Sequence, residues 1–166
     1  LGLVRNNRAA IDNWKATGVV LSDYANDNMT ASFIPEKDYK DMVSEDAVPL
    51  SYMFAVTNLV DSSDKVNVSI FGQEWDSFIS PSLIEGNYPE NDQEVVVDQS
   101  FENYGIKLGD AIQLNGSETS FKIVGLTKGN KFFTEPVVFT SLTTYWNLQG
   151  TTKANRSISA LVLQND

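Results

Sequence analysis

The chain has 166 residues, of which 42% are hydrophobic and 11% aromatic; this is enough apolar side chain to bury a core in one domain or two small subdomains, and it argues against disorder of the whole chain. The formal net charge is −10, and a surface this acidic repels phosphate backbones, which argues against nucleic-acid binding. The sequence contains neither cysteine nor histidine, which excludes a disulfide framework, thiol chemistry, the common zinc sites and catalysis by a serine–histidine or cysteine–histidine pair.

The acidic charge is concentrated in the first 98 residues, which carry 17 acidic and 6 basic side chains, whereas the remaining residues carry 5 and 6. An acidic surface favours solubility, and the alternative interpretation is a face that attracts a cation or a basic partner. No apolar run approaches the ~18 to 20 residues that span a bilayer, and no pattern indicates a signal peptide. The chain begins without methionine, from which we expect a fragment of a longer protein.

The start of the chain is predicted to be a helix followed by a strand. Residues 1–14 are typical of a helix, because Val4, Ile11 and Trp14 fall on one face. The apolar residues that follow predict a strand over 19–25.

The next part of the chain is predicted to form one helix and two strands. A helix is expected over 34–45, with Pro35 in its first turn. Strands are expected over 50–60 and 65–71, and the second alternates apolar with polar residues as a half-buried strand does. Together with the strand before the helix, these elements give a β-α-β-β order, and the last two strands are close enough in sequence to form a hairpin.

The stretch 82–126 has the clearest pattern in the chain, because strand, helix and turn signals follow one another without gaps. Loop residues at 86–91 precede a short buried strand at 94–98. The further elements expected in this stretch are helical turns ending at Gly105, an alternating strand over 106–114 with a bend at Gly109 and Asp110, a hairpin turn at Asn115-Gly116, and a returning strand over 120–126. After it we expect a strand over 136–140, a helix over 140–150, a linker over 151–156 and a strand over 157–164.

No pattern in the sequence is typical of a catalytic, metal or cofactor site. Asp23 and Asp27 near Asn28, or Asp61 with Asp64, offer oxygen ligands for calcium, but neither group has EF-hand spacing, so loop carboxylates are the simpler interpretation. The glycines match neither a dinucleotide-binding nor a phosphate-binding loop, and no histidine is present to activate a serine. We therefore predict no catalytic residue, no cofactor and no metal.

Two adjacent phenylalanines lie in an expected loop. Phe132 and Phe133 follow Lys131 in a segment with loop composition. An exposed pair of this kind is a candidate apolar contact loop for a membrane or an apolar ligand. The alternative is that both rings fold over the small β unit as the edge of its core.

The order of motifs in 82–126 resembles the extracytoplasmic domain of MacB/FtsX-type ABC transporter permeases. A glycine and a proline precede a Glu-Val-Val-Val strand, a Gly-Ile-x-x-Gly-Asp turn follows, and a Phe-x-Ile-Val-Gly-Leu strand closes the unit. Within that family, the pattern is most similar to Gram-positive permeases of the haem-exporter type. The matching signature positions are Gly86, Pro89, Glu94, Gly105, Gly109, Asp110, Phe121, Val124 and Gly125.

The resemblance implies an α+β domain of two subdomains. A stalk helix over 1–18 would continue from a transmembrane helix. A porter-like β-α-β membrane-proximal subdomain would comprise 19–74 plus 151–166 and be truncated at its C-terminus. A β-rich, sabre-like distal subdomain over 75–150 would be inserted into it.

The resemblance also implies a non-catalytic function on the extracellular face of the cell membrane. Such a domain relays conformational change between a permease and a separate cytoplasmic ATPase, in export or extraction of a hydrophobic or amphipathic cargo such as haem, a peptide or a lipid. The expected partners are that ATPase, a second permease copy in a homodimer, and the cargo. Because the chain has no histidine or cysteine, a haem site here would need tyrosine or methionine ligands, and we expect that site in the membrane part instead.

Two other functions remain open from the sequence. A secreted or wall-attached peptide- or glycan-binding module predicts a concave, aromatic-lined pocket, and a hydrolase predicts titratable groups converging in one cleft. The permease interpretation predicts that the start of the chain and the strand at 157–164 leave the domain on the same side.

Overall fold

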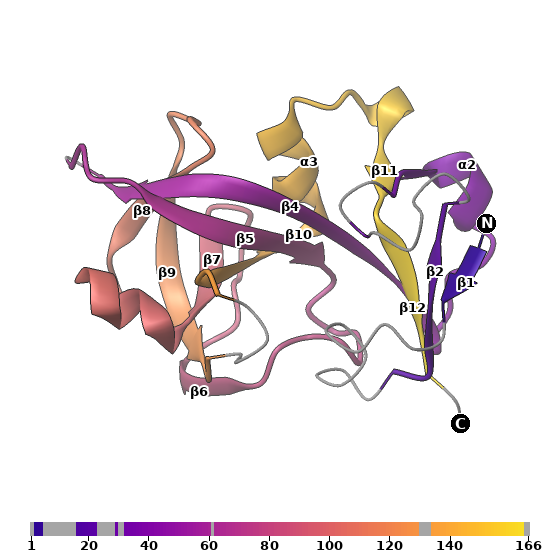
Figure 1. Ribbon diagram of the computed structural model, residues 1–166, viewed down its shortest axis with the longest axis horizontal. Helices are drawn as coiled ribbons and strands as arrows, with labels where there is room; N and C mark the ends of the chain where they lie inside the picture. The colour runs from indigo at the N-terminus through magenta and orange to yellow at the C-terminus, as the bar shows by residue number, and fades with distance from the viewer. Residues whose placement is uncertain are drawn as a thin grey trace. The chain divides into compact units, whose positions relative to one another are not determined.

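The computed structural model describes residues 2–4, 16–22, 29, 32–60, 62–129 and 134–164 (Figure 1). The fold is mixed α/β and consists mainly of β-sheet. The chain forms two compact units. Unit 1 comprises 1–52, 73–80 and 150–166, and unit 2 comprises 53–72 and 81–149.

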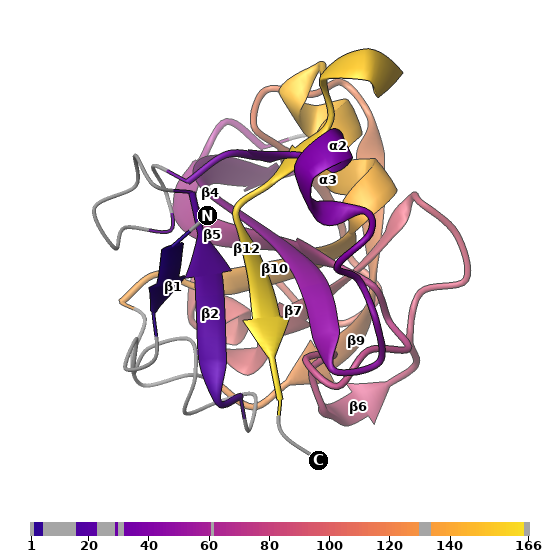
Figure 2. The same ribbon diagram turned by 90° about the vertical axis from the view of Figure 1, so that its right-hand side faces the viewer.

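Unit 1 contains an antiparallel sheet in the order β1-β2-β12-β4 (Figure 2). Its strands are β1 (Gly2–Val4), β2 (Gly18–Leu21), β12 (Ala160–Leu163) and the first part of β4 (Ala47–Leu59). All four residues of β2 are buried, which is why their sequence is continuously apolar rather than alternating. Ser159, next to β12, adds two hydrogen bonds to β4. Its backbone N–H donates to the Leu50 carbonyl, and its hydroxyl oxygen accepts from the Tyr52 N–H, each at 2.9 Å.

A second, two-stranded sheet in unit 1 pairs β3 (Ile34–Pro35) with β11 (Ser157–Ile158). The helix α2 (Glu36–Tyr39) follows β3, and the short 3₁₀ helix η4 (Lys153–Asn155) precedes β11. The helix predicted over 34–45 is therefore too long. Tyr39 is the only buried residue of α2, and Met42 and Val43 are 41% and 44% exposed, so no apolar face packs to extend the helix.

The predicted helix over 1–14 is wrong at its start. Residues 2–4 form β1, whose backbone pairs with Val19 to Leu21 of β2, and residues 5–15 lie outside the described part of the chain. The expectation that both ends of the chain leave on one side is also wrong for the described residues. Because β1 and β12 both run antiparallel to β2, Gly2 lies beside Leu21 at one end of β2, while Leu163 lies beside Gly18 at the other.

The strands of unit 2 pair in a closed ring. The order is β4-β5-β10-β7-β9, and β8 pairs with both β9 and β4 to complete the ring. Besides the second part of β4, its strands are β5 (Val66–Gln73), β7 (Glu94–Asp98), β8 (Ala111–Leu114), β9 (Ser120–Thr127) and β10 (Val137–Ser141). The pair β7–β9 is parallel, and β6 (Leu83–Gly86) pairs with the second half of β9.

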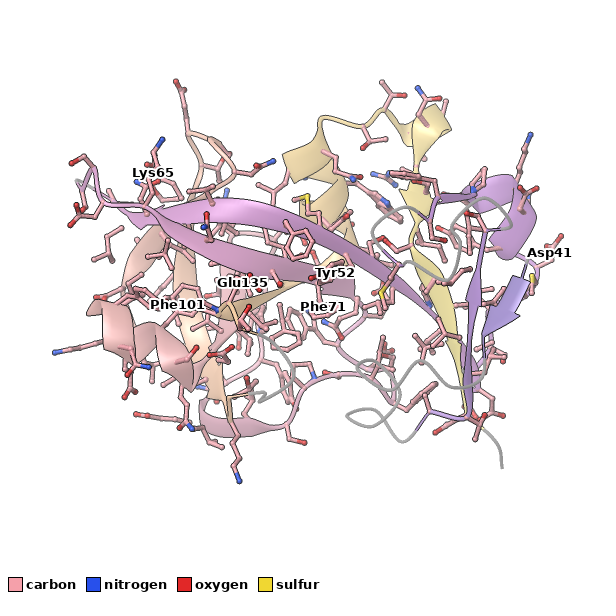
Figure 3. All side chains as sticks on the ribbon, in the orientation of Figure 1. Asp41, Tyr52, Lys65, Phe71, Phe101 and Glu135 are labelled. Atoms are coloured by element: carbon pink, nitrogen blue, oxygen red, sulfur yellow. The ribbon has the colours of Figure 1, made fainter. Side chains whose placement is uncertain are left out.

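The core of unit 2 covers both faces of β7, because successive side chains of a strand point to opposite faces of the sheet. Val95, Val96 and Val97 of β7 are fully buried, as is Phe101 (labelled in Figure 3) of the 3₁₀ helix η3 (Gln99–Tyr104). β8 and the first half of β9 alternate buried with more exposed residues, as the sequence predicts. The helix α3 (Leu142–Gln149) follows β10 and buries Leu142, Thr144, Tyr145 and Trp146.

The two units divide the chain differently from the predicted subdomains. Residues 53–72, expected in the first subdomain, belong to unit 2, and residues 73–80 belong to unit 1. The physical reason is that β4 is one strand of 13 residues. Its first part pairs with β12 and its last part pairs with β8, so a single strand contributes to both units.

A buried carboxylate joins three segments of unit 2. Asp98 is 3% exposed. One of its oxygens accepts a hydrogen bond from the Val137 N–H at 2.7 Å, and the other accepts from the Ser100 backbone N–H at 2.8 Å and from the Ser100 hydroxyl. Asp98 is thus the N-cap of η3 and a link from the end of β7 to the start of β10.

We expect Asp98→Ala to lower the free energy of unfolding by about 2–4 kcal/mol, because it removes the cap and leaves the buried Val137 N–H without an acceptor. Urea unfolding measures the change. Asp64→Ala is the matched control, because Asp64 is exposed and exposed substitutions usually change stability by less than about 0.5 kcal/mol. Equal stability of the two variants would contradict this role for Asp98.

Tyr39 of α2 is buried, with 5% of its surface exposed. Burial raises the pKa of its hydroxyl to about 12, and the negative charge of Glu36 adds to the effect. An unfolded tyrosine titrates near pH ~10, so the folded state holds the proton more tightly. The contribution of Tyr39 to stability is therefore complete below pH ~10 and is lost as the pH rises through about 12.

Measuring the free energy of unfolding across this pH range tests whether Tyr39 loses its contribution to stability as the pH rises. The free energy of unfolding of the unsubstituted chain should fall more steeply between pH ~10 and ~12 than that of Tyr39→Phe, which has no proton to lose. Parallel pH profiles for the two proteins would show that the Tyr39 pKa is not raised on folding.

Candidate functional site

Among the described residues, no group of three or more Asp, Glu, His or Cys side chains is arranged to hold a metal ion. Of the proposed calcium ligands, Asp23, Asp27, Asn28 and Asp61 lie outside the described residues, and Asp64 is exposed. In the same described ranges, no helix is long and apolar enough to cross a membrane.

Gly86 and Gly125 face each other where β6 pairs with β9. Gly86 has φ +83°, and a Cβ atom on it would lie 2.2 Å from the carbonyl oxygen of Val124. A Cβ atom on Gly125 would lie 2.7 Å from the carbonyl oxygen of Asn87. The Asn87 N–H donates to the Val124 carbonyl at 2.8 Å. Both glycines are therefore needed for the close approach of two backbones, and neither faces a ligand site.

The Gly-Ile-x-x-Gly-Asp turn sets the start of β8. Gly105 ends η3 in the left-handed conformation, with φ +76°. Gly109 has φ +93°, and its N–H donates to the Ile123 carbonyl at 2.9 Å. Asp110 accepts the Lys107 N–H on its side-chain oxygen at 2.8 Å, and its own carbonyl accepts the Ile123 N–H at 2.9 Å. The turn thus holds β8 in register with β9, and Asp110 closes it, as the sequence indicates.

The remaining signature residues close a loop or pack in β9. A Glu94 side-chain oxygen accepts the Glu90 N–H at 2.7 Å, which closes the loop that contains the half-buried Pro89. Phe121 is buried and Val124 is half-buried in β9. Phe132 and Phe133 lie outside the described residues, so the apolar contact loop stays a prediction.

Hollows lined by described residues of each unit were not foreseen from the sequence. In unit 1, a groove of ≈520 Å³ is lined by the apolar residues Val43, Val48 and Phe78 and by the acidic residues Glu45, Glu74 and Asp76. In unit 2, a smaller hollow of ≈210 Å³ has mainly polar lining residues. The residues of each come from separate segments of the chain, so no local spacing pattern indicates them.

We expect substitutions of Gly109 and Gly86 to differ in their effect on stability, because only Gly86 lies against another backbone. At Gly109, where a Cβ atom meets nothing within 4 Å, alanine should cost about 1–2 kcal/mol from backbone strain alone, and Gly109→Asn should recover part of that loss because asparagine tolerates the left-handed region. For Gly86→Ala, the overlap of the new Cβ atom with Val124 should add about 1–3 kcal/mol to this loss of stability, and Gly86→Asn should be no more stable than Gly86→Ala. Urea unfolding of the alanine and asparagine variants at both positions measures these differences. An equal gain from asparagine at both positions would contradict the close-approach explanation.

The chain was then compared with known proteins, and no protein-family model matches it. It is 21% identical over 131 residues to a protein of Staphylococcus epidermidis named as the hemin transport system permease HrtB, and the match covers 79% of this chain and 37% of that protein. It is 21% identical over 128 residues to the HrtB of Staphylococcus haemolyticus, covering 75% and 35%. The chain therefore matches little more than a third of the length of these relatives.

Three solved structures share the fold. The extracellular domain of the noncanonic ABC-type transporter YknZ from Gram-positive bacteria superposes with a TM-score of 0.62 at 12% identity, covering 89% of this chain and 82% of that one. The periplasmic region of MacB from Actinobacillus actinomycetemcomitans gives 0.54 at 15% identity, covering 80% and 66%. A permease domain from Porphyromonas gingivalis gives 0.52 at 15% identity, covering 77% and 60%.

These findings confirm the resemblance that the signature residues predicted. The relatives are named as permeases, and two of the three structures are named as extracellular or periplasmic parts, as expected from the stretch 82–126. The chain is homologous to the HrtB permeases and has the fold of the extracytoplasmic domains of MacB-like ABC transporter permeases.

Proposed function

We propose that this chain is the extracellular domain of an ABC transporter permease subunit and that it relays movement during export or extraction of a hydrophobic or amphipathic substrate. The observation that carries the proposal is homology to the HrtB permeases over 79% of the chain. The fold shared with the extracellular domain of YknZ is the second support. The domain is non-catalytic in this proposal, and ATP is hydrolysed by a separate cytoplasmic subunit.

The internal packing of unit 2 suits a part that transmits displacement. A closed ring of hydrogen-bonded strands deforms less easily than an open sheet, because every strand of the ring has neighbours on both sides. β4 runs without interruption from unit 1 into unit 2, which gives a continuous backbone along which a displacement can pass. A relay of this kind needs two states whose contacts differ, and we place those states in the full permease homodimer.

We infer the substrate class from the relatives. The relatives' names indicate hemin, and peptides and lipids are the other amphipathic candidates. Because the sequence offers no histidine or cysteine, axial ligation of haem by this domain would fall to tyrosine or methionine. We therefore place recognition of a haem substrate in the membrane part of the permease.

The full-length protein, produced with its cognate ATPase in a bacterial strain that lacks the transporter, tests the proposal. We expect the pair to raise the haem concentration that the cells survive, and an ATPase variant that binds but does not hydrolyse ATP should abolish the protection. Protection by the permease without the ATPase would contradict the proposal. So would a lack of protection against all three substrate classes, namely haem, amphipathic peptides and membrane-active lipids.

The same strain tests on which side of the membrane the domain lies. The chain has no cysteine, so a single introduced thiol is informative when compared with the unsubstituted protein. Tyr104→Cys, at a residue that is 53% exposed, should react in intact cells with a maleimide that cannot cross membranes. Val96→Cys, at a fully buried position, should not react until the protein is denatured. Labelling of Tyr104→Cys only after lysis would place the domain inside the cell.

A further inference from the structure

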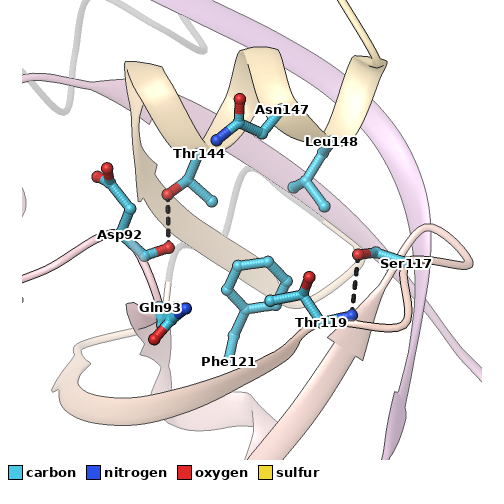
Figure 4. A pocket seen from close by; sticks show the side chains of 8 residues that line it. All are labelled: Asp92, Gln93, Ser117, Thr119, Phe121, Thr144, Asn147 and Leu148. Atoms are coloured by element: carbon cyan, nitrogen blue, oxygen red, sulfur yellow. Dashed lines mark hydrogen bonds between the residues drawn. The ribbon is translucent and has the colours of Figure 1, made fainter.

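The small hollow of unit 2 lies where three segments of the chain meet (Figure 4). These segments are the turn before β7, the hairpin between β8 and β9, and the helix α3. The hollow measures ≈210 Å³, which is below the ~300–1,000 Å³ of pockets for drug-sized ligands. It therefore has room for a single ring-sized group.

An aromatic ring forms the floor of the hollow. Phe121 projects from β9 into it, and Leu148 of α3 covers the opposite side (Figure 4). Phe121 is 4% exposed, because it lies on the buried side of the alternating first half of β9. The floor thus offers a narrow apolar surface at a fixed position.

Hydrogen bonds within unit 2 fix the walls. The Thr144 hydroxyl donates to the Asp92 carbonyl at 2.8 Å, and the Ser141 hydroxyl donates to the Asp92 carboxylate at 2.8 Å. On the hairpin side, the Ser117 hydroxyl oxygen accepts the Thr119 N–H at 3.2 Å. These contacts tie the turn before β7 to the start of α3 and close the hairpin.

Three polar groups on the rim remain available to a ligand. The side-chain amides of Gln93 and Asn147 and the hydroxyl of Thr119 line the hollow and are exposed. None of the three has a hydrogen bond to another group in the described part of the chain. Each side-chain amide has two N–H donors and one acceptor oxygen, and the hydroxyl can donate one hydrogen bond and also accept.

The charges around the hollow disfavour anions. None of its lining residues is basic, so an anion has no partner there, and the one carboxylate, that of Asp92, is exposed and keeps its negative charge although it accepts a hydrogen bond. A neutral ligand whose groups both donate and accept matches the two amides and the hydroxyl. A hydroxyl-bearing ring has this chemistry on its edge, and its C–H face suits the phenyl floor.

We propose that this hollow binds one neutral pyranose unit of a saccharide, with Gln93, Asn147 and Thr119 bonding its hydroxyls over Phe121. The site is additional to the relay function above and does not depend on it. The pyranose is either a free monosaccharide or the terminal unit of a longer glycan, and both present the same chemistry.

Titration of the chain with sugars, followed by amide chemical shifts in NMR spectra, tests the proposal. The probes are glucose, galactose, mannose and N-acetylglucosamine, with chitotetraose as the glycan and glucose 6-phosphate as the anionic counterpart of glucose. We expect at least one neutral sugar to shift resonances of residues 92–93, 117–121 and 144–148, and glucose 6-phosphate to bind more weakly than that sugar. Binding of chitotetraose at least as tight as that of N-acetylglucosamine would identify a glycan end as the ligand, and much weaker binding of chitotetraose would identify the free sugar.

Three variants make the test specific. Gln93→Ala and Asn147→Ala should each weaken binding roughly fivefold, the effect of losing one hydrogen bond of about 1 kcal/mol. Asn103→Ala is the matched control, because it removes an exposed amide of η3 that does not line the hollow. All three change exposed side chains, and unchanged shifts elsewhere in the spectrum verify folding. Absence of binding by every neutral sugar, or equal loss in all three variants, would overturn the proposal.

Discussion

Both edges of strand β9 carry hydrogen-bonded neighbours, and the arrangement of unit 2 depends on this double pairing. β7 lies along one edge in parallel, while β8 and β6 share the other edge in succession. β8 then reaches β4, which closes the ring. A closed ring leaves no unpaired strand edge to attract another chain. This arrangement requires that β6 and β8 both lie in the correct register along β9.

The signature residues meet that requirement. Gly86 and Gly125 let β6 approach β9, and the turn at Gly109 and Asp110 holds β8 against it. What marks this stretch as similar to transporter domains is therefore a set of backbone constraints rather than a set of reactive groups. The polar hollow combines two loop segments with α3 and with Phe121, which is itself a signature residue of β9.

The sequence predicts the elements whose signals are local. The strand at 94–98, the cap at Gly105, the hairpin turn at Asn115 and the helix after β10 all appear where side-chain periodicity or turn chemistry indicated them. It does not predict features set by pairing between distant segments. The length of β4 depends on β12 and β8, and the strand conformation of 2–4 depends on β2. The hollow combines Gln93, Thr119 and Asn147, whose proximity no spacing rule reveals.

The position of β12 has a consequence for how the chain is assembled during synthesis. β12 lies between β2 and β4, so residues 160–163 must be made before the sheet of unit 1 can form. Unit 2 ends at residue 149, and its ring is complete earlier. Unit 2 is therefore completely synthesised while β2 and the first part of β4 still lack the strand between them. Until that strand arrives, their apolar faces and facing backbone edges are the part of the nascent chain that depends most on protection from aggregation.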